Sequence, residues 1–248
     1  MRLEGKVALV TGAARGFGAG IAEVFGREGA RLVLIDIDRE GVETIAKQQS
    51  NHAIGLAADV TKAKDWQTAV GACVDKFGRL DIVVNNAGTS HRNQPLLDVA
   101  EQEFDRVFTV NVKSIYLSAQ AAVPIMREQG GGVFINIGST AALRPRPGLA
   151  WYNGSKGAVH LISRTMAVEL APDKIRVCVI APVAGDTPLL ATFMGEDTPE
   201  RRAAFVATVP LGRLSTPRDV ANTALFLASE EAGFLTGNVV EVDGGRCV

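Results

Sequence analysis

Short apolar runs alternate with amphipathic segments along the whole chain. The apolar runs are rich in Val and Ile, show little polar alternation, and lie near residues 6–11, 31–36, 53–58, 81–85, 132–138, 175–181 and 238–242. Such runs are typical of parallel strands that are covered on both faces. Helical periodicity occupies the intervals near 17–28, 39–49, 62–77, 100–128, 151–171 and 217–228. This alternation predicts an α/β fold, a doubly wound parallel sheet of about seven strands with helices on both faces.

One segment, from about residue 186 to 210, breaks this alternation. It contains turn-forming clusters at Asp186-Thr187-Pro188, Met194-Gly195-Glu196-Asp197 and Pro199. The sequence has no internal repeat, linker or low-complexity stretch. We therefore predict a single dinucleotide-binding and catalytic domain over residues 1–248, with a substrate lid at about 186–210.

Composition and charge narrow the class of protein. Of the 248 residues 47% are hydrophobic and 21% are charged, and the formal net charge is −1. We therefore expect a globular protein with no nucleic-acid partner. No stretch reaches the roughly 20 apolar residues that a membrane span needs, and the N-terminus has no signal-peptide pattern. Three scattered Cys and three His lack metal-ligand spacing, so we expect a cytoplasmic protein without a metal.

A glycine-rich turn follows the first apolar run and precedes a helix. Gly12, Gly16 and Gly18 stand in Thr11-Gly12-Ala13-Ala14-Arg15-Gly16-Phe17-Gly18. Glycine lets backbone N–H groups approach a pyrophosphate at the positive end of the helix. An ordinary tight strand-to-helix turn is the alternative, and the glycines alone do not decide between them.

Asp36 favours the dinucleotide interpretation. It ends the second strand-like run, where a carboxylate can accept hydrogen bonds from both ribose hydroxyls of the adenosine. The same charge would repel a 2′-phosphate, which favours NAD over NADP. Arg15 is a contrary signal, because a basic side chain in the glycine turn could meet that phosphate.

Two later positions add to the cofactor prediction. Asp59, followed by Val60, comes after the third strand-like run, where it could meet the adenine amino group. Asn86, Ala87 and Gly88 close the fourth run with small residues where the backbone must pass near a cofactor. Each could instead be a helix cap or a turn residue.

Tyr152 and Lys156 stand one helical turn apart, and Ser139 ends an apolar run upstream. Oxidation of an alcohol needs a base within hydrogen-bond reach of its oxygen. A free phenol with a pKa of about 10 is a poor base at neutral pH, so we expect the Lys156 charge to lower the pKa of Tyr152. Ser139 could orient the substrate oxygen. Taken singly, the Tyr/Lys pair is typical of a solvated helix face, and only the conjunction with the glycine turn favours catalysis.

These motifs together closely resemble the short-chain dehydrogenase/reductase family in its single-domain form, over nearly the whole chain. The glycine motif matches Gly12, Gly16 and Gly18, the Asn-Asn-Ala-Gly motif matches 85–88, and the catalytic tetrad matches Asn111, Ser139, Tyr152 and Lys156. The resemblance implies a Rossmann fold and a bound NAD(P).

The resemblance also implies roles for single residues. Asn111 would hold a water that links Lys156 to solvent, Lys156 would bind the nicotinamide ribose, and Thr187 would contact the carboxamide. Pro182 begins Pro182-Val183-Ala184-Gly185, which departs from the family's usual Asn-Pro-Gly or Pro-Gly beside the nicotinamide. The resemblance further makes the long helices subunit contacts of a homotetramer or homodimer.

The substrate is the least determined feature. A carboxylate, sulfonate or phosphate of the substrate could be bound by basic residues, namely His91, Arg92, Arg144 and Arg146, together with Ser139 and Tyr152. These basic residues could instead be surface charge in a loop or an oligomer contact. The main prediction is an NAD-dependent oxidoreductase acting on a small secondary alcohol or ketone, such as a hydroxy acid, sugar or polyol. The alternatives are an NADPH-dependent 3-oxoacyl thioester reductase and a non-catalytic dinucleotide-sensing protein.

Overall fold

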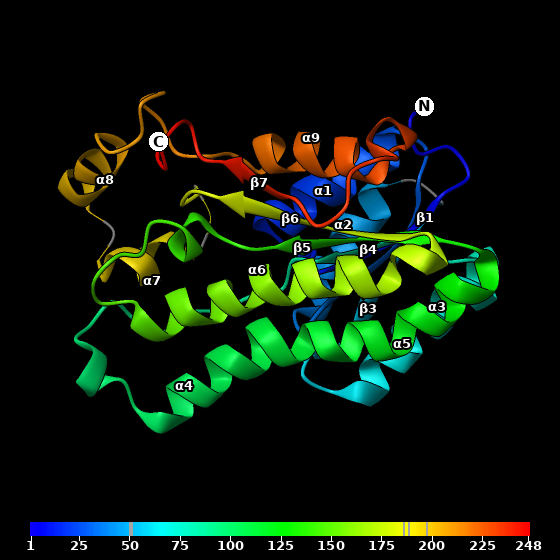
Figure 1. Cartoon of the computed structure of the whole chain (residues 1–248), viewed down its shortest axis with the longest axis horizontal. Coiled ribbons are helices and arrows are strands. Elements are labelled where there is room, and N and C mark those ends of the chain that lie inside the picture. The colour runs from blue at the N-terminus through cyan, green and yellow to red at the C-terminus, as the bar shows by residue number, and fades with distance from the viewer. Residues whose placement is uncertain (50–51, 186, 188, 197) are drawn as a thin grey trace.

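The computed structural model describes residues 1–49, 52–185, 187, 189–196 and 198–248. Its centre is a parallel sheet of seven strands in the order β3-β2-β1-β4-β5-β6-β7. The strands are β1 (Val7–Thr11), β2 (Arg31–Asp36), β3 (Ala53–Ala57), β4 (Ile82–Asn85), β5 (Gly132–Ile137), β6 (Ile175–Pro182) and β7 (Val239–Val242). The sequence prediction of a doubly wound parallel sheet is confirmed (Figure 1).

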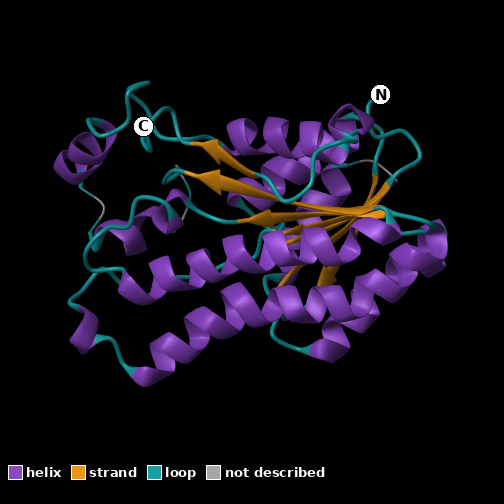
Figure 2. Cartoon of the chain, in the orientation of Figure 1, coloured by secondary structure: helices purple, strands orange, loops and turns teal. Residues whose placement is uncertain are grey.

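Helices cover both faces of the sheet, as the apolar runs without polar alternation require. One buried cluster joins α1 (Gly16–Arg27), α2 (Arg39–Gln48) and α9 (Pro217–Ala228) to the sheet. A second cluster joins α3 (Ala63–Phe77), α5 (Ser114–Gln129) and α6 (Ala150–Leu170) to the opposite face. Figure 2 shows these two helical layers on either side of the strands.

The predicted helix near 100–128 is in fact three consecutive segments. It consists of α4 (Glu101–Phe108), a π-helical turn (Thr109–Lys113) and α5. The π-helical turn contains Asn111, and such turns are frequent at functional sites. Short 3₁₀ turns occur at Leu96–Asp98, Thr140–Ala142, Ala171–Asp173 and Glu230–Ala232.

The carboxyl ends of the strands face one end of the molecule, where the C-terminus and two short helices also lie (Figure 1). These helices are α7 (Leu190–Met194) and α8 (Pro199–Val206), and they occupy the segment that we predicted as a lid. Asp186, Pro188 and Asp197 of that segment lie outside the described residues. Among the described residues, no helix is long and apolar enough to cross a membrane.

A buried carboxylate fixes the start of the central strand. Asp81 is 7% exposed, and its Oδ2 accepts hydrogen bonds from the Val7 backbone N–H at 2.8 Å and from Arg79 Nε at 2.8 Å. The bond from Val7 joins β1 to the start of β4, and so helps to hold the two strands that carry the cofactor motifs in register.

Candidate active site

A cavity of about 720 Å³ opens at the carboxyl ends of the strands. This is where ligands bind in open parallel sheets, because the strand order reverses there and the connecting helices diverge. The cavity is lined by most of the residues that the sequence motifs singled out: Gly12, Arg15, Gly16, Phe17, Asp36, Asp59, Val60, Asn86, Ala87, Gly88, Ser139, Arg144, Arg146, Tyr152, Lys156, Pro182 and Thr187.

The glycine turn is shaped for a close backbone approach. Gly12 and Gly16 have φ of +63° and +58°, a region that only glycine adopts readily. A Cβ added to Gly18 would lie 2.1 Å from the carbonyl oxygen of Gly12. Asn86 Nδ2 donates to the Thr11 and Gly12 carbonyl oxygens at 2.8 and 3.0 Å, so the end of β4 holds the turn in place. The arrangement leaves the N-terminal end of α1 facing the cavity, as a pyrophosphate site needs.

Asp36 lies at the end of β2, on the rim of this turn. Its Oδ2 accepts from Ala14 N at 3.0 Å and its Oδ1 from Asp38 N at 3.0 Å. Each carboxylate oxygen has further acceptor capacity, so the group remains available to two hydroxyls. Arg15 is exposed on the same rim.

Asp59 is partly committed to its own turn. Its Oδ1 accepts from Thr61 N at 3.0 Å and from the Thr61 hydroxyl at 2.7 Å. Burial acts to raise the pKa of Asp59, but the hydrogen bonds from Thr61 and the charge of Lys62 outweigh it, so the pKa is lowered. The turn role that the sequence left open is therefore present, and Asp59 and Val60 also line the cavity.

The four tetrad residues converge from three elements. Tyr152 and Lys156 lie on α6, with the Lys156 Nζ 6.0 Å from the centroid of the Tyr152 ring. Ser139 follows β5, and its hydroxyl is close enough to the phenol to favour the phenolate form. Lys156 Nζ donates to the Ile137 carbonyl oxygen at 2.8 Å, which fixes the ammonium beside the end of β5.

The fourth tetrad residue, Asn111, is fixed by the π-helical turn. Its Oδ1 accepts from Thr89 N at 2.8 Å, and its Nδ2 donates to the Thr89 carbonyl oxygen at 2.9 Å and the Ser155 hydroxyl at 3.0 Å. A Cβ added to Gly88 would lie 3.4 Å from Asn111 Oδ1 and 3.6 Å from Lys156 Nζ, so the three residues meet closely. Since Asn111 Oδ1 accepts one bond here, it has capacity for one more, as a bound water would need.

The pKa of Tyr152 differs from the sequence-based expectation. Burial raises the pKa of the phenol to about 12, and the Ser139 hydrogen bond and the charge of Arg146 only partly oppose the rise. Burial also lowers the pKa of the Lys156 ammonium to about 8. The expectation of a lowered Tyr152 pKa is therefore wrong in direction when only the protein's own residues act on the phenol. Tyr152 is 5% exposed, and desolvation disfavours the phenolate.

A buried histidine contacts the backbone of Ser139, and no sequence motif indicated this role. His160 Nε2 accepts from the Ser139 backbone N–H at 3.4 Å. Burial lowers the pKa of His160 to about 4, and the charges of Lys156 and Arg164 act in the same direction. The ring is therefore neutral at physiological pH and can accept this bond.

The segment Pro182-Val183-Ala184-Gly185, whose sequence departs from the usual motif, lines the cavity. Val183 N donates to the Val242 carbonyl oxygen at 3.1 Å, which extends the pairing with β7. A Cβ at Gly185 would lie 2.4 Å from the Phe17 ring, so only glycine fits beside that ring. Thr187 faces the glycine turn, with its Cγ2 3.4 Å from a Cβ added to Gly16.

The basic residues predicted for the substrate end fall into two groups. Arg144 and Arg146 line the cavity. His91 is not among the lining residues of the described chain, because its side chain is fully buried and its Nδ1 is bonded to the Arg92 carbonyl oxygen at 2.8 Å. The expected contact of His91 with substrate thus has no geometric support.

The further lining residues that the sequence did not single out include Phe193, Phe205 and Arg246. The two phenylalanines lie in the predicted lid, where apolar side chains in a turn-rich segment were a usable signal. Arg246 follows Gly244-Gly245 after β7, and no local sequence pattern indicated its place at the cavity.

The chain is similar over nearly its whole length to known proteins. Residues 12–246 match the sequence profile of a family described as enoyl-(acyl carrier protein) reductase. The chain is 48% identical to the 4-formylbenzenesulfonate dehydrogenase of Comamonas testosteroni, with 99% of each chain covered. It is 38% identical to a cyclopentanol dehydrogenase of Comamonas testosteroni, with 98% of each covered. A crystal structure of 3-ketoacyl-(acyl-carrier-protein) reductase from Brucella melitensis complexed with NADH is 46% identical, has a TM-score of 0.95, and the match covers 99% of this chain and 100% of that chain.

Proposed function

We propose, since this chain belongs to the short-chain dehydrogenase/reductase family, that it prefers NAD and interconverts a small alcohol and its carbonyl compound. The family and the named relatives make it an NAD(P)-dependent oxidoreductase that acts on CH–OH groups. The observation that carries the proposal is the convergence of Ser139, Tyr152 and Lys156 on one wall of a cavity whose opposite end holds Asp36.

The residues present fit a nicotinamide dinucleotide. The glycine turn would face the pyrophosphate, Asp36 the adenosine ribose, and Asp59 with Val60 the adenine. Asn86, Ala87 and Gly88 would pass beneath the middle of the cofactor. At the nicotinamide end stand Lys156, Pro182 and Thr187. The bound cofactor would accept or supply the hydride.

The chain's own residues would move the proton. Tyr152 Oη would take it from the alcohol in oxidation and return it in reduction, while the Ser139 hydroxyl orients the substrate oxygen. Because burial keeps the phenol protonated, the protein alone is set for proton donation. Lys156 would hold the nicotinamide ribose, and Asn111 would hold a water beside it.

The preference for NAD rests on Asp36. A 2′-phosphate placed beside this carboxylate would be repelled, whereas the exposed Arg15 on the same rim would attract it. We expect the wild type to favour NAD over NADP. Asp36→Ala should reduce this preference for NAD by about ten- to a hundredfold, which is the effect of losing one charge-assisted contact.

Kinetics with NAD and NADP test this preference, with Arg15→Ala as the matched control that should widen it. A wild type that strongly prefers NADP would contradict the proposal. It would favour the NADPH-dependent 3-oxoacyl thioester reductase, the second candidate, which is supported by the 46% identical reductase structure; that structure, however, holds NADH. Binding of NAD without turnover of any alcohol or carbonyl compound would favour the dinucleotide-sensing alternative.

We also propose that the enzyme self-associates. Tyr116 on α5 and Leu161 and Val168 on α6 are 60%, 67% and 78% exposed. Such apolar side chains on neighbouring long helices support self-association, as a homodimer or homotetramer. We further propose that the protein is cytoplasmic and that the segment at about 186–210 closes over the substrate.

A further inference from the structure

The charges that line the cavity are unevenly distributed. The carboxylates of Asp36 and Asp59 lie with Arg15 at the proposed adenosine end, whereas three arginines lie together at the substrate end: Arg144, Arg146 and Arg246. Arg106 also lines the cavity, but its guanidinium donates to the Thr89 hydroxyl and the Ser90 carbonyl oxygen. The tetrad needs no such group of arginines. Their convergence therefore calls for a partner of opposite charge.

Arg146 is the arginine whose charge acts on the Tyr152 phenol. Its guanidinium carbon lies 4.8 Å from the centroid of the Phe205 ring and 6.0 Å from that of Phe193. Burial lowers the pKa of Arg146, and the positive charge of Arg246 lowers it further. Within the described parts of the chain, no carboxylate lies at ion-pair distance from this guanidinium. A half-buried cation flanked by a like charge is costly unless an anion joins it.

Arg246 approaches from the C-terminal segment. It is 7% exposed, and its guanidinium carbon lies 4.9 Å from the centroid of the same Phe205 ring. One of its nitrogens donates to the Thr208 hydroxyl, and Arg144 donates to its backbone carbonyl oxygen. Arg146 and Arg246 thus share one aromatic ring, while Arg144 supports the backbone that carries Arg246.

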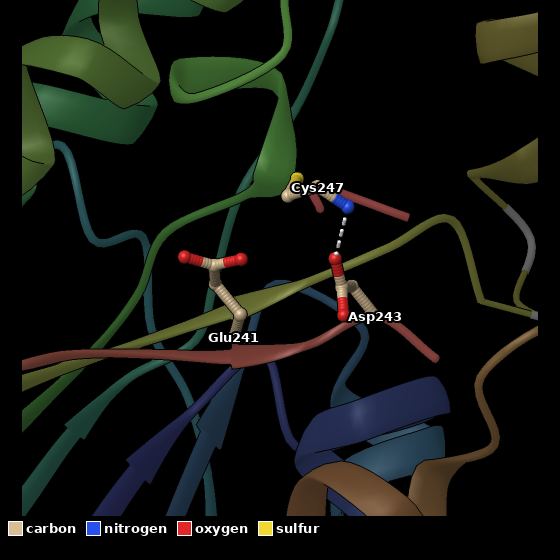
Figure 3. A group of neighbouring side chains, drawn as sticks. All are labelled: Glu241, Asp243 and Cys247. Carbon is tan, nitrogen blue, oxygen red and sulfur yellow. Dashed lines mark hydrogen bonds between the residues drawn. The ribbon is translucent and has the colours of Figure 1, made fainter. Parts of the chain in front are cut away.

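The turn that carries Arg246 is fixed by Asp243. Its Oδ2 accepts from Cys247 N at 2.7 Å, as Figure 3 shows, and its Oδ1 accepts from Gly245 N at 2.9 Å. The neighbouring Cys247 thiol has its pKa raised to about 11 by burial and by the charges of Asp243 and Glu241, so it stays protonated. The Asp243 carboxylate therefore positions the turn that carries Arg246.

The spacing to Tyr152 limits the size of the substrate. The centroid of the Phe193 ring lies 4.9 Å from that of the Tyr152 ring and 6.0 Å from the guanidinium carbon of Arg146. Arg146 is also close enough for its charge to act on the phenol. A substrate whose oxygen meets Tyr152 would therefore reach the arginines with a group about one aromatic ring away.

We infer that Arg146 and Arg246, supported by Arg144, form an anion-binding subsite, and that the substrate is an aromatic alcohol or carbonyl compound bearing an oxyanion one ring away from the reacting carbon. A sulfonate or carboxylate meets this description, and guanidinium groups bind both through paired hydrogen bonds. The Phe193 and Phe205 rings would contact the substrate ring. The identity of the reacting alcohol or carbonyl group rests on the proposed function, whereas the binding of the anion to the arginines does not.

The experiment uses the full chain and three para-substituted benzyl alcohols, which carry a sulfonate, a carboxylate or a neutral sulfonamide. We expect the charged compounds to have the lower KM. Arg146→Ala and Arg246→Ala should each raise KM for the preferred anion by about ten- to a hundredfold, with a smaller effect on kcat. The neutral sulfonamide should be nearly insensitive to both changes. Arg218→Ala, an exposed arginine outside the cavity, is the matched control and should change nothing.

Calorimetry with benzenesulfonate separates this inference from the proposed function. If no alcohol is turned over but benzenesulfonate binds and the two variants weaken it, the anion subsite stands and the function fails. If the sulfonamide is used as well as the sulfonate, and both variants leave KM within about twofold, the subsite is overturned while the function stands. Arg146→Lys, which retains the charge, should recover part of the affinity and guards against a misfolded alanine variant.

Discussion

Ionisation of Tyr152 can be measured directly, because the chain has only two tyrosines. In the Tyr116→Phe variant, every change in phenolate absorbance comes from Tyr152. Burial raises the pKa of this phenol from 10.0 to about 12, and this rise corresponds to about 3 kcal/mol against phenolate. At about pH 10.5 only about 3% of the protein should therefore carry phenolate, whereas an unperturbed tyrosine would be about three-quarters ionised.

Oxidised NAD should reverse this rise. A positive charge about 4 Å from the phenol is worth about 4 kcal/mol at an effective dielectric constant of about 20, which exceeds the cost of burial. The titration midpoint should then fall to 10 or below with NAD⁺ present. NADH is the control, since its ring carries no positive charge and should leave the midpoint high.

The assay is an absorbance titration from neutral pH to about pH 10.5, with circular dichroism to verify folding and Tyr116→Phe/Tyr152→Phe as the blank. Phenolate that appears in the protein alone with a midpoint at or below 10 would refute the argument from burial. An equal shift with NADH would show that the cofactor acts by changing the cavity rather than through its charge. If the pKa is raised as burial predicts, the phenol stays protonated through neutral pH. Reduction should then persist through neutral pH, while oxidation should increase as pH rises.

Two further predictions concern single side chains. Lys156→Ala should lower turnover by about a hundredfold or more and weaken dinucleotide binding, because its ammonium would hold the nicotinamide ribose beside Tyr152. Steady-state kinetics and a fluorescence titration measure the two effects, and unchanged dinucleotide binding would contradict the ribose role. Asp81→Ala should lower the free energy of unfolding by about 2–4 kcal/mol, since the Val7 N–H and Arg79 lose a buried acceptor. Urea denaturation measures the loss, and a value within about 0.5 kcal/mol of the wild type would show that water replaces the carboxylate.

The sequence by itself determined the order of strands and helices and the main motifs of the site. Strand residues such as those of β1 are buried on both sides, so apolar runs without alternation predicted them within a residue or two. The glycine turn and Asp36 were recognisable because their roles depend on local backbone geometry at a strand end. Tyr152 and Lys156 were recognisable because one helical turn separates them, whatever the rest of the chain does.

Only the tertiary structure decided which distant side chains meet and how solvent reaches them. Arg146 and Arg246 are 100 residues apart in the sequence numbering, and no local pattern indicates that they share the Phe205 ring. His91 looked available beside a loop arginine, yet packing buries it completely. The direction of the Tyr152 pKa likewise depends on desolvation, which is set by every atom around the phenol rather than by Lys156 alone. Local periodicity depends on residues that are close in the sequence. Burial and the convergence of charged side chains arise only when separate elements pack together.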